Sequence, residues 1–67
     1  MNITKATEQY IAEHPSIKDC VKKRLVNYSR LSRLVIRDCN LKNSDFDAVL
    51  IAARRYFWKL SKIAEAD

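Results

Sequence analysis

The chain has 67 residues, contains no glycine and carries a formal net charge of +5. So short a chain forms one domain, residues 1–67, and without glycine it can form neither glycine-rich phosphate-binding loops nor the hairpin turns that require glycine. The positive charge favours an anionic partner, which can be nucleic acid or the acidic surface of another protein.

Apolar spacing predicts a first helix over residues 3–14. Pro15 ends this helix, because the residue before a proline is driven out of the helical region. Ser16 then has the features of an N-cap, with Asp19 three residues later as the reciprocal partner of a capping box. A second helix is therefore predicted over residues 17–25.

Polar residues also mark the beginnings of two further helices. Asn27 is the predicted N-cap of a third helix, residues 28–39. After a short polar turn, Ser44 and Asp47 repeat the capping-box signature at the beginning of a fourth helix, residues 45–65. Four helical segments without any strand pattern predict an all-α fold.

The fourth helix carries an apolar seam with a heptad-like spacing of 4, 3, 4, 3 and 4 residues. Its members are Phe46, Leu50, Ala53, Phe57, Leu60 and Ala64. At 1.5 Å per residue the helix is about 30 Å long, more than the second and third helices can cover. The preferred interpretation is that the first helix covers the rest. The alternative is a homodimer, in which the overhanging end, residues 57–67, pairs through Phe57, Leu60 and Ala64.

No group of residues suggests catalysis or metal binding. His14 is the only histidine and stands at a helix end, where a cation complements the helix dipole. Cys20 and Cys39 fall on apolar helix faces and lack the spacing of zinc ligands. We therefore expect no enzymatic activity, cofactor, metal ion or small-molecule ligand. Without a secretory signal or an apolar run of membrane-spanning length, we expect a cytoplasmic protein with reduced thiols and no membrane partner.

Basic residues form two sets on the outward sides of the last two helices. The set on the third helix is Arg30, Arg33 and Arg37. The set on the fourth helix is Arg55, Lys59 and Lys62, with Arg54 alongside. Cations at this helical spacing can contact a row of DNA phosphates, and arginine can do so with two hydrogen bonds. The alternative interpretation is that they only solvate the helix surfaces.

Trp58 follows the seam residue Phe57, so its side chain points about 100° away from the seam. Arg54 and Lys62 stand four residues to either side, within reach of a cation–π contact. An exposed tryptophan there could stack on bases or anchor a protein interface. The preferred interpretation is that Trp58 packs under the first helix, because large aromatic side chains are usually mostly buried.

Residues 16–60 resemble a three-helix DNA-binding unit of the helix-turn-helix type. More closely, the chain resembles the N-terminal region of archaeal predicted regulators of amino-acid metabolism that carry an ACT domain, in the stretches HPSIKDC, NYS, LSRL and FDAVLIA. This resemblance covers residues 1 to about 60. It implies a helix-turn-helix-like core formed by helices two to four, with an N-terminal helix (residues 1–14) before it and a long C-terminal helix. It also implies a regulator, or a fragment of one, that binds duplex DNA. The sequence departs from the common motif in that no wing follows the core.

The resemblance makes residues 45–59 the recognition helix and residues 28–39 the helix before it. Two carboxylates, Asp45 and Asp47, stand at the beginning of that recognition helix and would repel the DNA backbone. DNA contact is therefore expected from the arginines of the third helix instead. The alternative function is a helical protein-interaction or dimerisation module that does not bind nucleic acid.

Overall fold

The protein is described by a computed structural model, which covers the backbone of residues 2–65 and the side chains of residues 2–61. Over these residues the secondary structure is helical, and the prediction of an all-α fold is confirmed. In chain order the elements are α1 (Ile3–Ala12), α2 (Pro15–Lys22), α3 (Tyr28–Asp38), a single 3-10 turn η1 (Asn43–Asp45) and α4 (Phe46–Glu65).

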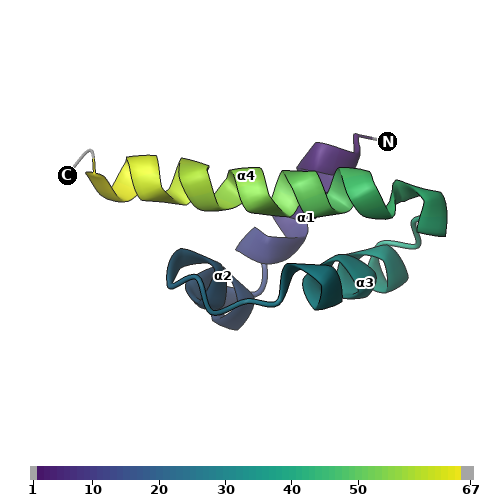
Figure 1. Ribbon diagram of the computed structural model, residues 1–67, viewed down its shortest axis with the longest axis horizontal. Coiled ribbons are helices and arrows are strands. Elements are labelled where there is room, and N and C mark those ends of the chain that lie inside the picture. Colours follow the sequence, from purple (N-terminus) through teal and green to yellow (C-terminus); the bar gives the residue numbers. More distant parts are fainter. Residues whose placement is uncertain (1, 66–67) are drawn as a thin grey trace.

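Helix α4 is a long rod against which the shorter helices pack (Figure 1). The contacts of α4 with α1 and with α3 are the most extensive, and α2 contacts both α1 and α4. The core between them contains Ile11, Val21, Val35, Val49 and Ala53, all fully buried. Over the residues described, no helix combines the length and the apolar character that a membrane crossing requires.

The beginning of α2 differs from the prediction. Ser16 does not cap α2. The helix begins at Pro15, and His14 occupies the N-cap position without a side-chain hydrogen bond. Proline suits the first helical position because its missing N–H group has no partner there in any case. Asp19 is not part of a capping box either, since it forms an ion pair with Lys23 at 3.1 Å.

Of the caps predicted at the beginnings of α3 and α4, the first is confirmed and the second is wrong. Asn27 caps α3 as predicted, its side-chain oxygen accepting from the backbone N–H of Arg30 at 3.1 Å. The predicted box of Ser44 with Asp47 is wrong. The carboxylate of Asp45 accepts from the backbone N–H of Lys42 at 3.1 Å, which closes η1 before α4 begins.

Helices α2 and α3 both end in a turn that normally uses glycine. In each turn a residue with positive φ follows the helix, Arg24 at 59° and Asn40 at 57°. The next backbone N–H then returns to the helix, from Leu25 to the carbonyl of Cys20 and from Leu41 to the carbonyl of Ile36, both at 2.9 Å. These bonds are those of a Schellman motif. Asparagine tolerates the left-handed conformation, whereas arginine is unfavourable there.

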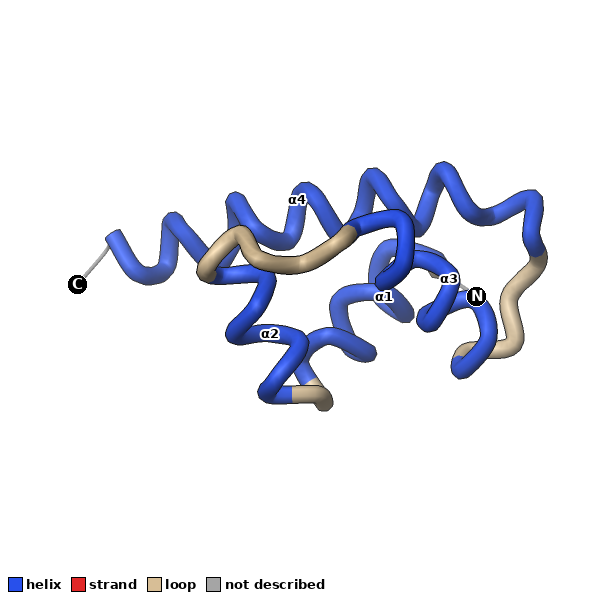
Figure 2. Tube along the Cα trace, turned by 60° about the horizontal axis from the view of Figure 1, so that its bottom comes forward, coloured by secondary structure: helices blue, strands red, loops and turns tan. Residues whose placement is uncertain are grey.

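The buried side of α4 is rotated from the predicted seam. Val49, Ala52 and Ala53 are buried, whereas the expected seam residues Phe46 and Leu50 are only half-buried. The rotation arises because α1 and α3 both pack on α4, so the buried stripe lies between these two contacts. In the view of Figure 2 the α2–α3 loop passes in front of α4, and the Cζ of Arg24 in this loop lies 4.8 Å from the ring centroid of Phe57 on α4.

In the far half of α4, the seam residue Leu60 is covered within the chain. Leu60 is 7% exposed and shares the core with Tyr10 and Ile11 of α1. This agrees with the preferred interpretation that the first helix covers the seam. The side chain of Ala64 lies outside the described residues, so its predicted place in a dimer seam is not described.

Candidate nucleic-acid interface

The outer face of α3 holds the first predicted set of cations together. Arg30, Arg33 and Arg37 are all exposed, while Leu31 and Val35 of the same helix are buried. The two groups lie on opposite sides because their positions differ by about half a helical turn. Neither Arg30 nor Arg33 forms an ion pair with any described residue. The guanidinium groups of these two arginines can therefore bind an incoming anion.

A single carboxylate lies at the C-terminal end of this face. Asp38 accepts a hydrogen bond from the Nε of Arg37 at 3.1 Å and another from the hydroxyl of Tyr10 at 2.6 Å. The bond from Tyr10 and, after it, the bond from Arg37 hold the pKa of Asp38 below its ordinary value of 3.8. The same bond to Asp38, with burial, raises the pKa of Tyr10 to about 12. Asp38 thus ties α3 to α1 and offsets part of the charge of Arg37.

A hollow beside the end of α3 brings further polar groups to Arg33 and Arg37. It is lined by these two arginines, by Asn40 and Asn43, and by apolar residues of α3, the following turn and the beginning of α4. Asparagine and arginine side chains are both common donors to DNA phosphates. Sequence reasoning treated Asn40 and Asn43 only as a turn. The signal that could have identified the turn is the residue type of Asn40, because asparagine tolerates the left-handed conformation that it adopts there, with a φ of 57°.

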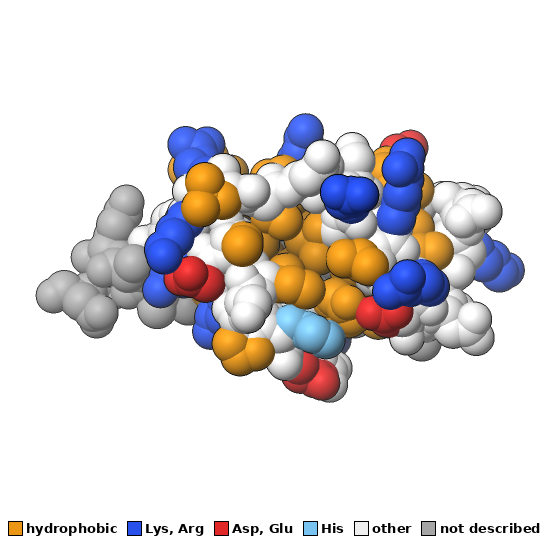
Figure 3. Space-filling view, turned by 90° about the horizontal axis from the view of Figure 1, so that it is seen from below, with side chains coloured by type: hydrophobic (Ala, Val, Ile, Leu, Met, Phe, Trp, Pro, Cys, Tyr) orange, Lys and Arg blue, Asp and Glu red, His pale blue; other side chains and the backbone are white. Residues whose placement is uncertain are grey.

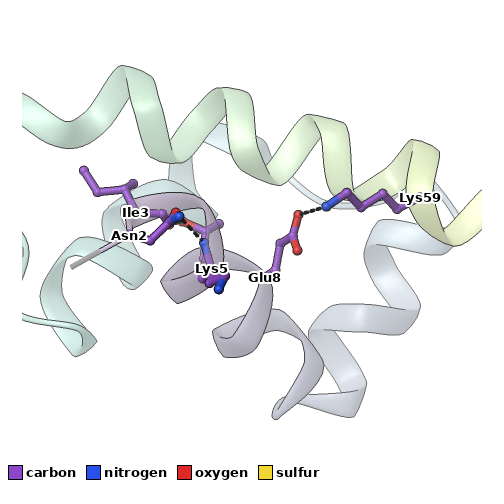
Figure 4. A network of polar contacts seen from close by, with 6 residues as sticks. Asn2, Ile3, Lys5, Glu8 and Lys59 are labelled. Atoms are coloured by element: carbon purple, nitrogen blue, oxygen red, sulfur yellow. Dashed lines mark hydrogen bonds and ion pairs between the residues drawn. The ribbon is translucent and has the colours of Figure 1, made fainter.

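The cations of α4 do not share one surface with those of α3. Arg54 lies over the ring of Tyr28, with 5.9 Å from its Cζ to the ring centroid. Lys59 points toward α1 and forms an ion pair with Glu8 at 2.7 Å (Figure 4). Arg55 is exposed on the outward side of α4, and the side chain of Lys62 lies outside the described residues. The second predicted set is therefore distributed over several directions.

Trp58 is exposed, not packed under α1 as the preferred interpretation held. Its exposed fraction is 60%. Among the described cations, the one over its ring is Arg24 and not the expected Arg54: the Cζ of Arg24 lies 5.9 Å from the ring centroid of Trp58 and 4.8 Å from that of Phe57. Phe57 faces the α2–α3 loop and Lys59 faces α1, so Trp58, between them, points outward. Sequence reasoning missed Arg24, which only the left-handed turn brings to α4.

An apolar hollow lies between α2 and α3. Its lining includes Ile17, Cys20, Val26, Leu31 and Leu34. Figure 3 shows apolar side chains gathered on this side of the molecule with Lys and Arg side chains around them. The proposed dimer seam presents no comparable surface among the described residues, because Leu60 is buried and Phe57 lies under Arg24.

His14 and the two cysteines occupy structural positions. The Nδ1 of His14 lies 2.6 Å from the carbonyl oxygen of Tyr10, and the two rings stack at 4.2 Å. Since a carbonyl can only accept, Nδ1 carries the proton of this hydrogen bond. Cys20 and Cys39 are half-buried free thiols, and burial raises the pKa of Cys39. Among the described residues no cluster of His, Cys, Asp or Glu could hold a metal ion.

Comparison of the chain with models of protein families, with curated proteins and with solved structures found no match. The candidate interface is defined by its own geometry. Its most coherent part is the outer face of α3, where Arg30, Arg33 and Arg37 share one exposed surface.

Proposed function

We propose that the chain is a DNA-binding module, a regulator or the DNA-binding part of one, that contacts duplex DNA through the outer face of α3. The observation that carries the proposal is the shared exposed face of Arg30, Arg33 and Arg37. In this proposal α2, α3 and α4 act as a helix-turn-helix-like unit. The helix that faces DNA is α3, because α4 begins next to the carboxylates of Asp45 and Asp47.

The dimensions of the α3 face fit a row of phosphates. Residues 30 to 37 span about 10 Å along the helix, since each residue adds 1.5 Å. Successive base pairs of one strand are separated by about 3.4 Å, so this length corresponds to roughly three steps. Asn40 and Asn43 extend the row of donors beyond Arg37. Contacts of this kind fix position and affinity, whereas sequence is read from base edges.

An NMR titration of the chain with a duplex oligonucleotide tests the proposal. The amide signals of α3 and of residues 40–43 should shift at low salt, and those around Arg55 should stay unchanged, because Arg55 lies on the outward side of another helix. Shifts centred on Arg55, or no shifts at low ionic strength, would contradict contact through α3.

The apolar hollow between α2 and α3 favours a second candidate, a module that dimerises without nucleic acid. A homodimer that forms through the hollow has a melting temperature that rises with protein concentration. Leu34→Asp, which places a charge in the hollow, should abolish that rise. Ile51→Asp, at a half-exposed position of α4, is the matched control and should retain it. A melting temperature independent of concentration in the unmodified chain excludes this candidate.

A further inference from the structure

Two arginines and three aromatic residues meet where the α2–α3 loop reaches α4. We call this group the Arg–aromatic cluster. It lines one hollow and consists of Arg24, Tyr28, Arg54, Phe57 and Trp58. No carboxylate is among the described residues that line it, and two of these residues are arginines. The cluster lies near the N-terminal end of α3, where Tyr28 begins the helix. The hollow lined by Asn40 and Asn43 lies at the opposite, C-terminal end of α3.

The contacts within the cluster hold the cations against aromatic faces. The Cζ of Arg24 is 4.8 Å from the ring centroid of Phe57 and 5.9 Å from that of Trp58. The Cζ of Arg54 is 5.9 Å from the ring centroid of Tyr28. A guanidinium that lies over a ring keeps its N–H donors at its edge, where they can bind an anion.

Trp58 provides the open aromatic surface of the cluster. Its ring meets that of Phe57 edge-on, at 5.1 Å between centroids and 73° between planes. Phe57 fixes the orientation of the indole, yet 60% of Trp58 remains exposed. An oriented, exposed indole beside two guanidinium groups suits a ligand that is both planar and anionic.

The backbone at Arg24 indicates that its side chain has a role beyond the turn. Arg24 is held at a φ of 59°, where a residue with a Cβ atom is unfavourable. The equivalent position after α3 is taken by Asn40, which tolerates this conformation. Strained non-glycine residues cluster at functional sites. What arginine adds here is the guanidinium over Phe57 and Trp58.

We propose that the Arg–aromatic cluster binds an unpaired nucleotide of a single-stranded nucleic acid. The base stacks on the exposed indole of Trp58, and the phosphate accepts hydrogen bonds from Arg24 and Arg54. A nucleotide uses both the aromatic surface and the cations, whereas an aliphatic carboxylate uses the cations alone. The site is separate from the contact of α3 with duplex DNA and does not depend on it.

Trp58 is the only tryptophan of the chain, so its fluorescence reports directly on this site. We expect a single-stranded oligothymidylate to quench the emission of the full chain in a saturable way at low salt, because a stacked base contacts the indole. An abasic oligonucleotide of equal length and charge should bind about tenfold more weakly, since stacking contributes most of the difference. Equal binding of the two strands would overturn the proposal, as would an acidic peptide that quenches more strongly than the oligonucleotide.

Arg24→Gly separates a binding role from a structural one. Glycine relaxes the left-handed turn, so the melting temperature should stay unchanged or rise, while affinity for the single strand should fall about tenfold with the loss of one charge-assisted contact. Arg55→Ala removes the same charge from the outward side of α4 and should change affinity less than about twofold. Equal weakening by the two variants would show a non-specific charge effect and would refute the site.

A variant of α3 keeps this inference distinct from the proposed function. Replacement of Arg30, Arg33 and Arg37 by alanine should weaken duplex binding and leave the quenching of Trp58 by the single strand within about twofold. If the α3 variant abolishes quenching as well, one surface serves both ligands and the separate site is refuted. If duplex binding is absent from the outset but the quenching persists, the inference stands and the proposed function fails.

Discussion

Helices α3 and α4 carry basic residues at almost the same spacing, yet the two sets have different surroundings. On α3, Arg30 and Arg33 remain on one exposed face without an ion-pair partner among the described residues. On α4, Lys59 is paired with Glu8 and Arg54 lies over Tyr28. Helical spacing determines which residues share a side of their own helix. Whether a basic residue is free of other contacts depends on which side chains the neighbouring helices place beside it.

Helix α1 accounts for part of this difference. It packs along α4 and places Glu8 beside Lys59, whereas its hydrogen bond to α3 runs from the hydroxyl of Tyr10 to Asp38, at the C-terminal end of α3. The outer face of α3 is therefore left open. Substitutions in α1 test whether this helix holds the core and separates the two basic sets.

The largest effect is expected from Ile11→Ala. Ile11 is fully buried where α1 meets the core, and its replacement should lower the free energy of unfolding by about 2–5 kcal/mol, from lost burial and the remaining cavity. Denaturation by urea measures the loss. Leu25→Ala, at a position that is 74% exposed, is the control and should change stability by less than about 0.5 kcal/mol. A loss below about 1 kcal/mol for Ile11→Ala would show that α1 does not hold the core.

A smaller, pH-dependent effect is expected from Tyr10→Phe, which removes the hydrogen bond to Asp38. Because the folded-state pKa of Asp38 is lowered, its contribution to stability is complete above the ordinary value of 3.8 and is lost as the pH falls through the folded-state pKa. The raised pKa of Tyr10 gives the opposite limit: its contribution is complete below 10.0 and is lost as the pH rises through about 12.

Urea denaturation of the unmodified chain and of Tyr10→Phe, at several pH values, measures this contribution. The unmodified chain should be the more stable one at neutral pH, and the difference should decrease toward both acid and alkaline pH. A difference that stays constant from acid to neutral pH would show that the bond between Tyr10 and Asp38 does not contribute through ionisation of Asp38.

The smallest effect is expected from Glu8→Gln, which removes the acid that pairs with Lys59 on α4. The ion pair is partly exposed, so the loss of stability should not exceed about 0.5–1 kcal/mol. With Lys59 released, affinity for duplex DNA should rise slightly more than in Glu13→Gln, a matched loss of an exposed acid on the side of α1 near His14. Equal affinities of the two variants would show that Glu8 does not control the access of Lys59.

The sequence predicted the helices well because each carries its own local signals. Periodic apolar residues located all four helices, and Asn27 was identified as the N-cap of α3. The errors arose where two local signals competed. At α2, Ser16 has the spacing of a capping box with Asp19, but Pro15 is the residue that begins the helix. At α4, Ser44 has the same spacing with Asp47, but the carboxylate that accepts a backbone N–H is that of Asp45, from Lys42.

The candidate site was predictable only in the part that lies on one helix. Arg30, Arg33 and Arg37 could be grouped from spacing alone, since they belong to one regular element. The contact of Arg24 with Trp58 could not, because it depends on a left-handed residue in a chain without glycine and on how the α2–α3 loop lies beside α4. Tertiary packing determines such contacts.

The salt dependence of duplex binding tests the central claim most directly. In the proposed complex the three arginines of α3 neutralise three phosphates, and each contact contributes about 0.9 to the slope of log K against log salt concentration. Replacing Arg30, Arg33 and Arg37 together by alanine should therefore reduce the magnitude of the slope by nearly three. The matched triple variant of α4, at Arg54, Arg55 and Lys59, should reduce it by less than one. Equal reductions in the two variants, or a larger one for α4, would contradict binding through the outer face of α3.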